Sequence, residues 1–417
     1  MSSRLIAAEG VRRAYDWGSP TAIPALLGLE PSGEPIAELW FGAHPGGPSP
    51  AAYSGGPSPG VARGDTLDAL IAADPVGLLG APTSLAFGDR LPFLLKVLAA
   101  DRALSIQVHP TIAQARAGYD AEDAAGIARD APERNYRDRN HKPELLCALS
   151  PFDALCGFRP VAGTLRLLAA LELAELAPIA ELLRGPDSLR AAFVALLDHP
   201  APASLAEAVT AALPRLAAHG EWAALGVELT RVATDFPGDV GLAVALLLNH
   251  VRLAPGQAIY LPAGNVHAYL RGTAIEIMAN SDNVLRCGLT GKHVDVAELL
   301  RVADFSALAE PRWPAADTGE GIRTFQVPLP DFQLAMIDLP AAGAFAELDQ
   351  TLPQLVLSTS GTVSTASVVE AGDHARITPG SAVFVAPGPS PAAVHGDGTV
   401  FIASPGPLRR EKSDTTM

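Results

Sequence analysis

The sequence predicts a mainly β protein with an α-helical insertion. Short apolar runs between Gly- and Pro-rich turns, which are typical of strands, fill roughly the first 155 residues. Strand-like alternation returns at about Val251, and a further alternating region runs from near Gly321 through Ile402. Between the strand-rich regions, from Gly163 to His219, the chain is rich in Ala and Leu, and its leucines recur at helical spacing.

A repeated pattern predicts that the β regions form two related domains. Gly256 to Gly264 is a glycine, a strand of about five residues and a Pro/Gly turn, and Gly380 to Gly388 repeats this order. Dividing the chain where its composition and periodicity change gives a first β-domain in two parts, residues 1–158 and 250–320, with a helical insertion, residues 159–249, between them. A second β-domain, residues 321–405, and a polar tail, residues 406–417, follow.

Smaller elements follow from local composition. Ser54–Gly64 is a loop rich in Gly, Pro and Ser, and short helices are expected at Thr66–Ala73 and Thr111–Tyr119. Proline removes a helical hydrogen bond, so we expect prolines to divide the insertion into short helices, at Pro178, Pro186, Pro200 and Pro214.

Composition and charge exclude several classes of protein. The chain has 417 residues, 48% of them hydrophobic, which suffices for a substantial core. Its net charge of −15 argues against nucleic-acid binding, because neutralising phosphates needs a basic face. The apolar run Gly241–Leu248 is too short to span a membrane, and the N-terminal residues lack the apolar core of a signal peptide. Cys147, Cys156 and Cys287 show no metal-type pairing, so we expect free thiols in a reduced, cytoplasmic protein.

The strand predicted at Leu104–Pro110 carries polar groups on one face. Its apolar residues share the other face, because strand side chains alternate with a period of two. The polar side chains that remain are Ser105, Gln107 and His109. Three polar groups on one face of an apolar strand need partners, which a metal ion and a polar ligand would supply.

Two further segments, Asn140–Glu144 and Leu261–His267, contain residues that complete a metal-ligand set. The set is Gln107, His109, Glu144 and His267. Zinc accepts histidine nitrogen and carboxylate oxygen, and a neutral amide ligand favours a site open to substrate over a closed structural site. The alternative is that the histidines are hydrogen-bonded core residues and Glu144 is a surface carboxylate. A single histidine would favour that interpretation, whereas the set favours a metal.

The segment Glu276–His293 is unusually polar between two apolar strands. Arg286 and Lys292 are candidates for anion binding, although Arg286 could be a surface charge. Asn283 is interpreted as a turn former. Only four of the 30 basic residues are Lys, and three of them lie in or beside the polar segments, namely Lys96, Lys142 and Lys292. Lysine is a compact point charge that arginine cannot replace in a tight site.

These residues resemble one family closely, type I mannose-6-phosphate isomerase (phosphomannose isomerase). The resemblance covers most of residues 11–158 and 250–305. The matching segments are Tyr15–Gly18, Ala37–Pro45, Leu91–Leu98, Leu104–Pro110, Asn140–Glu144, Cys147–Phe158, Leu261–Leu270 and Glu276–Val294. The resemblance implies two cupin-type jelly-roll domains, an inserted helical domain, and one zinc ion per chain, bound by Gln107, His109, Glu144 and His267. The second jelly roll is expected to hold no metal. His267 lies three residues after the first repeat, Gly256–Gly264, whereas the next histidine after the second repeat, Gly380–Gly388, is His395.

The implied reaction interconverts mannose 6-phosphate and fructose 6-phosphate through a cis-enediol. In the family the catalytic arginine matches Arg286, and we name Glu276 and Lys142 as candidates for proton transfer. Ser105, Lys96 and Lys292 are expected to serve the sugar phosphate or its approach. Trp17 and Tyr269 are expected to wall the pocket, with an ordinary role as core aromatics as the alternative for each. We expect a monomer that binds neither nucleic acid nor a membrane.

Other functions remain open at this stage. The rivals are an isomerase or epimerase of another phosphosugar, and a sugar-sensing cupin without activity. Loss of a metal ligand or of Arg286 would favour the sensor, and all are present. A bifunctional enzyme with a nucleotidyl transferase is disfavoured, because the chain lacks a Gly-rich phosphate loop.

Overall fold

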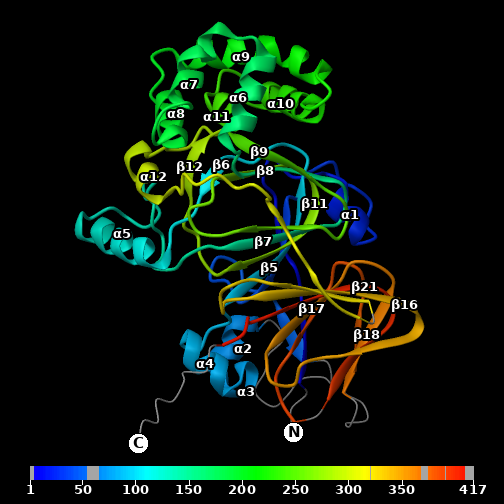
Figure 1. The fold of residues 1–417 in the computed structure, drawn as a ribbon. Coiled ribbons are helices and arrows are strands. Elements are labelled where there is room, and N and C mark those ends of the chain that lie inside the picture. The colour runs from blue at the N-terminus through cyan, green and yellow to red at the C-terminus, as the bar shows by residue number, and fades with distance from the viewer. Residues whose placement is uncertain (1–3, 54–64, 320, 368–373, 390, 409–417) are drawn as a thin grey trace, which may run out of the picture.

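The computed structural model describes residues 4–53, 65–319, 321–367, 374–389 and 391–408. The loop expected at Ser54–Gly64 lies outside these residues, as does the tail from Arg409 onward. Two large antiparallel sheets form the body of the molecule, and a group of helices covers one end of the first sheet (Figure 1). The prediction of a mainly β protein with a helical insertion is confirmed.

The first sheet is organised around its longest strand, β11. Its central order is β13-β10-β7-β11-β5-β3-β2, and β6, β8, β9 and β12 join it around the N-terminal end of β11. The strands are β2 (Val11–Arg13), β3 (Glu38–Gly42), β5 (Phe93–Ala100), β6 (Ile106–Val108), β7 (Glu144–Ala148), β8 (Phe152–Phe158), β9 (Leu248–Leu253), β10 (Ala258–Leu261), β11 (His267–Ala279), β12 (Leu285–Gly288) and β13 (Arg312–Trp313).

The second sheet combines the C-terminal strands with two strands from the N-terminal region. Ile6 pairs with Phe384 on one side and with Tyr53 on the other, so β1 and β4 lie at the edge of this sheet. The sequence-based division of the chain did not anticipate this pairing. The strands are β1 (Leu5–Ala8), β4 (Ala51–Tyr53), β14 (Ala316–Gly319), β15 (Ile322–Gln326), β16 (Gln333–Glu347), β17 (Gln354–Ser358), β18 (Thr362–Ser367), β19 (His374–Ile377), β20 (Ala382–Val385) and β21 (Ala392–Ser404).

The repeated sequence pattern occupies equivalent places in the two sheets. Gly256 and Gly380 have φ angles of +80° and +77°, a region that favours glycine, and each precedes a short strand, β10 or β20. A strand of 13 residues then follows in each sheet, β11 or β21. This correspondence supports the interpretation of two related β-domains.

The helical insertion covers the end of the first sheet that contains β6, β8 and β12. Its helices are α6 (Val161–Leu171), the 3₁₀ helix η1 (Ala174–Leu176), α7 (Ala177–Leu182), α8 (Ser188–Leu197), α9 (Pro202–Ala218), α10 (Ala223–Asp235) and α11 (Gly241–Ala245). Pro178 and Pro200 lie at or before helix starts as predicted, but Pro214 does not end a helix. It lies inside α9, where burial of Leu213 and Leu216 on either side favours continuing the helix despite the lost hydrogen bond.

The remaining helices are short. They are α1 (Ala22–Leu26), α2 (Leu67–Ala73), α3 (Pro75–Leu79), α4 (Ala81–Phe87), α5 (Ile112–Ala124) and α12 (Val296–Val302). The helix expected at Thr111–Tyr119 continues further, to Ala124. A capping box starts it, in which the Thr111 hydroxyl accepts from the Gln114 backbone and the Gln114 side chain accepts from the Thr111 backbone.

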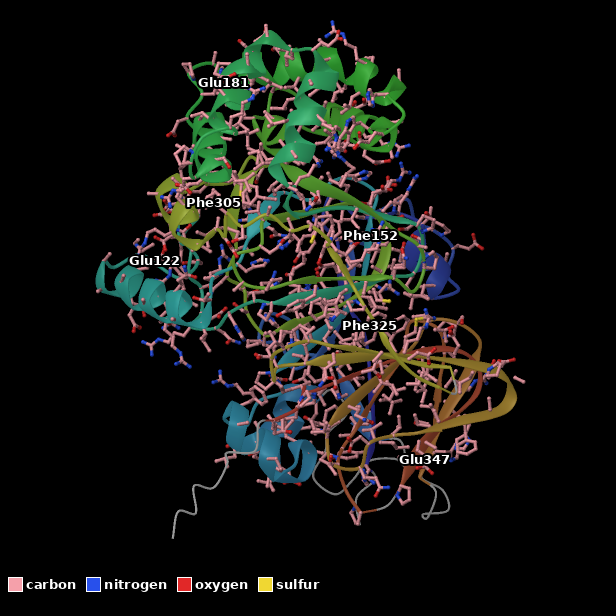
Figure 2. The ribbon with its side chains drawn as sticks, viewed as in Figure 1. Glu122, Phe152, Glu181, Phe305, Phe325 and Glu347 are labelled. Atoms are coloured by element: carbon pink, nitrogen blue, oxygen red, sulfur yellow. The ribbon has the colours of Figure 1, made fainter. Side chains whose placement is uncertain are left out.

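Two apolar cores hold these layers together. Phe305 packs against Phe158 and Phe193, with ring centroids 5.3 and 5.5 Å apart, and so joins the insertion to the first sheet (Figure 2). Phe325 belongs to the core shared by both sheets, with Phe93 from one and Phe401 from the other. Within the described residues, no helix has the length and apolar character needed to cross a membrane.

Candidate metal centre and active site

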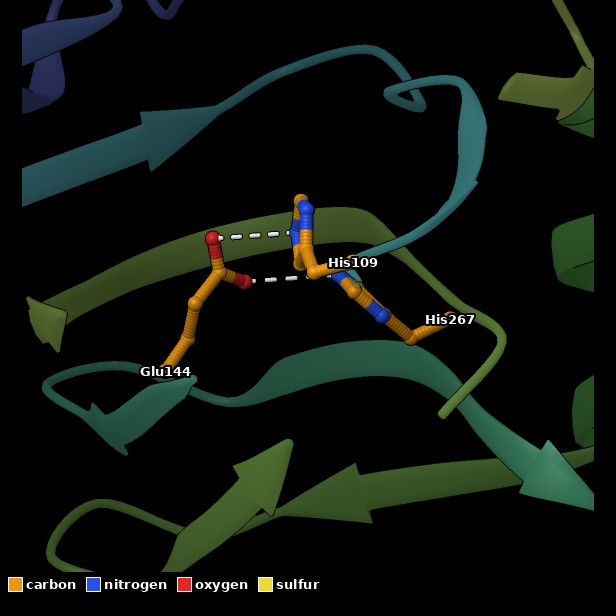
Figure 3. Close-up of side chains that lie close together, drawn as sticks. All are labelled: His109, Glu144 and His267. Carbon is orange, nitrogen blue, oxygen red and sulfur yellow. Dashed lines mark ion pairs between the residues drawn. The ribbon is translucent and has the colours of Figure 1, made fainter. Parts of the chain in front are cut away.

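Three predicted metal ligands meet inside the first sheet (Figure 3). His109 directly follows β6, Glu144 begins β7 and His267 begins β11, and each is only 1% exposed. Strand pairing places His267 opposite Gln107, two residues before His109. Glu144 lies opposite Met278 at the other end of β11, and its side chain reaches both histidine rings. Within the part of the chain that the structure describes, this is the one group of three or more His, Cys, Asp or Glu residues arranged to hold a metal ion.

Both imidazole rings are oriented by backbone carbonyl groups. His109 Nδ1 lies 2.7 Å from the Asn283 carbonyl oxygen, and His267 Nδ1 lies 3.0 Å from that of Asn265. A carbonyl oxygen only accepts, so each Nδ1 donates its proton and each neutral ring keeps an unprotonated Nε2. Metal-binding histidines are typically held in this way.

The two Nε2 atoms fit a metal ion. Each lies 3.3 Å from an oxygen of Glu144, yet neither has a hydrogen-bond partner among the described residues. A buried nitrogen lone pair without a partner is costly, and a cation bound between the rings and the carboxylate would satisfy both. Two nitrogens and a carboxylate oxygen are a ligand set that zinc accepts. The residues present therefore fit zinc.

Gln107 lies beside this group on β6. It is paired with His267 on one side and with Arg286 of β12 on the other. Ile106 and Val108 are buried in the core that faces the helical insertion, whereas Gln107 is half-buried. The expected alternation of this strand is therefore present, although the strand spans only Ile106–Val108 rather than Leu104–Pro110. Ser105 is half-buried just before it.

Burial and nearby charges set the protonation states of the metal ligands. Burial alone would raise the pKa of Glu144, but the Lys142 ammonium, 2.8 Å away, and His109 hold it well below its usual range. Burial, reinforced by the nearby Lys142, lowers the pKa of His109 to about 4. At neutral pH the carboxylate is therefore ionised and the ring is neutral, which are the forms that bind a metal ion.

A second row of polar side chains crosses three neighbouring strands. Lys96 of β5 lies opposite Glu276 of β11, and its Nζ is 2.8 Å from Glu276 Oε2 and 3.4 Å from Oε1 of Glu38. Burial opposes the positive charge, but these carboxylates outweigh it and raise the pKa of Lys96. The pKa of Glu276 is itself raised, because burial outweighs the attraction of Lys96.

Tyr269 links this row to the metal centre. Its hydroxyl donates to Glu276 Oε1 at 2.7 Å and lies 3.4 Å from Glu144 Oε2. The side chain is 1% exposed and belongs to the core inside the first sheet, and Trp17 packs on the same core. Trp17 is half-buried and stacks on Tyr15, which is 42% exposed and which the sequence did not single out.

Three cationic side chains lie near one another, one of them opposite Gln107, without anionic partners among the described residues. Arg286, Lys292 and Arg137 form no ion pair or side-chain hydrogen bond with any residue that the structure describes. Burial lowers the pKa of Arg286, with Arg137 adding to the effect, and burial with both arginines lowers that of Lys292. Arg137 is not among the residues predicted from the sequence, although its position just before the Asn140–Glu144 segment was a signal that could have indicated it.

Asn283 proves to be more than a turn former. Its side chain is fully buried and bonds to the backbone at Arg137, Asp138 and Asn140, while its own carbonyl oxygen holds His109. The interpretation of Asn283 as a simple turn residue was therefore wrong. The segment containing it is polar because it binds another segment of the chain.

Comparison with known proteins agrees with this geometry. The fold and the site define a metal-binding protein built on antiparallel sheets. The sequence model of a protein family, described as phosphomannose isomerase type I, catalytic domain, matches residues 6–161. Mannose-6-phosphate isomerase of Escherichia coli (strain K12) is 38% identical over 390 residues, covering 92% of this chain and 95% of that protein. The chain belongs to the type I phosphomannose isomerase family.

Solved structures show the same relationship. A crystal structure of mannose 6-phosphate isomerase in its zinc-bound holo form superposes with a TM-score of 0.86 at 33% identity, covering 97% of this chain and all of that one. The crystal structure of the apo form from Salmonella typhimurium superposes with a TM-score of 0.85 at 33% identity, covering 98% of this chain and all of that one.

Proposed function

We propose that this site interconverts mannose 6-phosphate and fructose 6-phosphate, with one zinc ion per chain. The observation that carries the proposal is the pair of buried Nε2 atoms, on His109 and His267, that face Glu144 without hydrogen-bond partners. Gln107, opposite His267, is the fourth proposed ligand. Membership of the family supplies the reaction, and its curated members carry this activity in their names.

The chemistry requires a proton to move between C1 and C2 of the open-chain sugar. Zinc, when bound, would supply a Lewis acid that polarises the sugar carbonyl. The chain's own groups must place the sugar, move the proton and stabilise the negative charge of the enediolate.

Lys142 is the better of the two candidates for proton transfer. Both oxygens of Glu276 are occupied, one by Lys96 and the other by Tyr269, and its side chain is 2% exposed. The side chain of Lys142 contacts one oxygen of Glu144 and is 11% exposed. We therefore assign proton exchange with the sugar to Lys142: its ammonium gives a proton to a sugar oxygen, and the free amine that remains accepts the proton from carbon. Glu276 then orients Tyr269 and balances the buried charge of Lys96.

The cationic group Arg286, Lys292 and Arg137 is the proposed site for the negative charge of the substrate. Burial and the charge of Arg137 lower the pKa of Arg286, and burial with both arginines lowers the pKa of Lys292, so an anion bound among the three groups would stabilise their positive charges. Arg286 lies opposite Gln107 in the strand pairing, so we assign it to the charge that develops on the sugar oxygens. Lys292 and Arg137 are assigned to the phosphate, with Ser105 as a further contact.

Trp17 and Tyr15 are proposed to border the entrance to the site. They stack with ring centroids 5.6 Å apart, and the pKa of Tyr15 is raised by burial and by Glu38, which contacts Lys96. The tyrosine thus lies close to the second polar row while remaining partly exposed.

The chain is proposed to act in a reducing compartment, the cytoplasm, as a monomer. Its three cysteines, Cys147, Cys156 and Cys287, are buried and free. Burial raises the pKa of each thiol, which keeps it protonated and unreactive. The net charge of −15 supports the expectation that nucleic acid is not a partner.

A coupled assay tests the proposed substrate. Mannose 6-phosphate should be converted to fructose 6-phosphate, and the reverse reaction should be measurable with the same enzyme. Other aldose and ketose phosphates serve as comparison substrates. Binding of mannose 6-phosphate without turnover would favour the non-catalytic sensor, and faster turnover of a different phosphosugar would favour the rival isomerase or epimerase.

A further inference from the structure

We propose that Asn283 is a positioning residue that holds the metal ligand His109 and the cationic segment at Arg137 in a fixed relation. The proposal rests on the proposed function, because it assigns a metal ion to His109 and the substrate phosphate to Arg137. It concerns a residue that touches neither group itself.

Both polar ends of Asn283 bind parts of the site. Its backbone carbonyl oxygen accepts the His109 Nδ1 proton at 2.7 Å. Its side-chain Oδ1 accepts from the backbone nitrogens of Arg137 at 2.7 Å and Asp138 at 3.2 Å. Its Nδ2 donates to the backbone oxygens of Asp138 and Asn140, both at 2.8 Å.

The side-chain amide uses its full hydrogen-bonding capacity in these contacts. It has two donor protons and an oxygen with two lone pairs, and both ends are engaged with the backbone of residues 137–140. The side chain is fully buried, so a substitution leaves backbone groups without partners and without water. An amide is therefore required at this position.

The position of Asn283 along the chain also connects it to Arg286, Lys142 and Glu144. It lies two residues before β12, the strand that carries Arg286. Residues 137–140, which it clamps, lead directly to Lys142 and Glu144. A shift of Asn283 would thus move one histidine ligand and loosen the segment that carries Arg137. Outer partners of metal-binding histidines typically contribute about 10- to 100-fold in metal affinity.

The test uses two variants and a matched control. Asn283→Ala removes every side-chain contact, and Asn283→Asp keeps the acceptor but turns a carboxylate toward two carbonyl oxygens. Asn249 is the control, because its Nδ2 also binds several backbone carbonyls, at 2.8 Å from Leu308 O and 3.2 Å from Phe158 O, but it holds no proposed ligand. Three quantities are measured: zinc affinity of the apoprotein against a chromophoric chelator, the inhibition constant of inorganic phosphate, and the melting temperature.

We expect both Asn283 variants to bind zinc at least about tenfold more weakly and to be inhibited severalfold more weakly by phosphate. Asn249→Ala should lower the melting temperature without changing either constant. The proposal is overturned if the Asn283 variants behave like Asn249→Ala, or if only one of the two constants changes. Failure of the proposed function would instead appear in the wild-type protein, as absent zinc binding or absent turnover.

Discussion

Lys142 Nζ lies 2.8 Å from Glu144 Oε1, so a buried ammonium group stands beside the carboxylate that faces both histidine rings. This contact places a proton donor next to the metal centre. It also keeps Glu144 ionised, because the positive charge holds its pKa well below the usual range.

Replacing Lys142 should mainly slow the chemical step. Lys142→Met keeps much of the side-chain length but removes the ammonium, so we expect kcat to fall about a hundredfold or more, which is about 2.7 kcal/mol of transition-state stabilisation. Exchange of the C2 proton with deuterated solvent should fall in parallel, while the zinc content stays at one per chain. A wild-type exchange rate in this variant would remove Lys142 from the proton path.

Glu276→Gln should act mainly on stability. The substitution removes one of the two carboxylates beside the buried Lys96 and leaves Glu38, at 3.4 Å, as its carboxylate partner. Breaking a buried ion pair typically costs about 3–5 kcal/mol. We expect a clear fall in the urea midpoint and a smaller loss of kcat than in Lys142→Met. If proton exchange is lost in Glu276→Gln and kept in Lys142→Met, then Glu276, and not Lys142, transfers the proton.

Arg286→Ala tests stabilisation of the enediolate. If the guanidinium acts on charge that develops in the transition state, kcat should fall about a hundredfold while KM changes little. Arg286→Lys keeps the charge but loses the planar fork, so we expect it to restore only part of the rate. A sharp rise in KM with kcat near the wild-type value would instead identify Arg286 as a phosphate anchor.

The stability of the metal-free protein should depend on His109 in mildly acidic solution. Burial lowers the pKa of this ring in the folded state from 6.5 to about 4, so the unfolded chain binds an extra proton between those values. The free energy of unfolding should therefore decrease as the pH falls from 6.5 toward 4. Urea unfolding at several pH values measures this slope, which should flatten in His109→Gln. An identical slope in wild type and variant would contradict the assignment.

The metal ligands were predictable from the sequence because each lies in a short, distinctive segment. His109, Glu144 and His267 meet as expected, and the strand face that carries Gln107 follows from simple alternation. The mainly β fold and the position of the helical insertion likewise follow from local periodicity.

The missed features depend on contacts between distant segments. Asn283 is a residue type typical of turns, and only its hydrogen bonds to Arg137 and Asp138 show its structural role. The strand at Leu5–Ala8 pairs with Ala382–Val385, a partner that no local pattern could identify. Pro214 shows the converse effect, since packing of its helix overrides a local helix-breaking signal.

Metal removal and reconstitution is the most direct test of the central claim, that zinc held by His109, Glu144 and His267 is required for isomerisation. Zinc content and turnover of mannose 6-phosphate are measured together, before chelation, after it, and after zinc is restored. We expect one zinc per chain, loss of activity with the metal and recovery on adding it back. His109→Ala and His267→Ala should lose both, whereas His395→Ala in the second sheet should lose neither. Full turnover in a demonstrably metal-free sample would contradict the account.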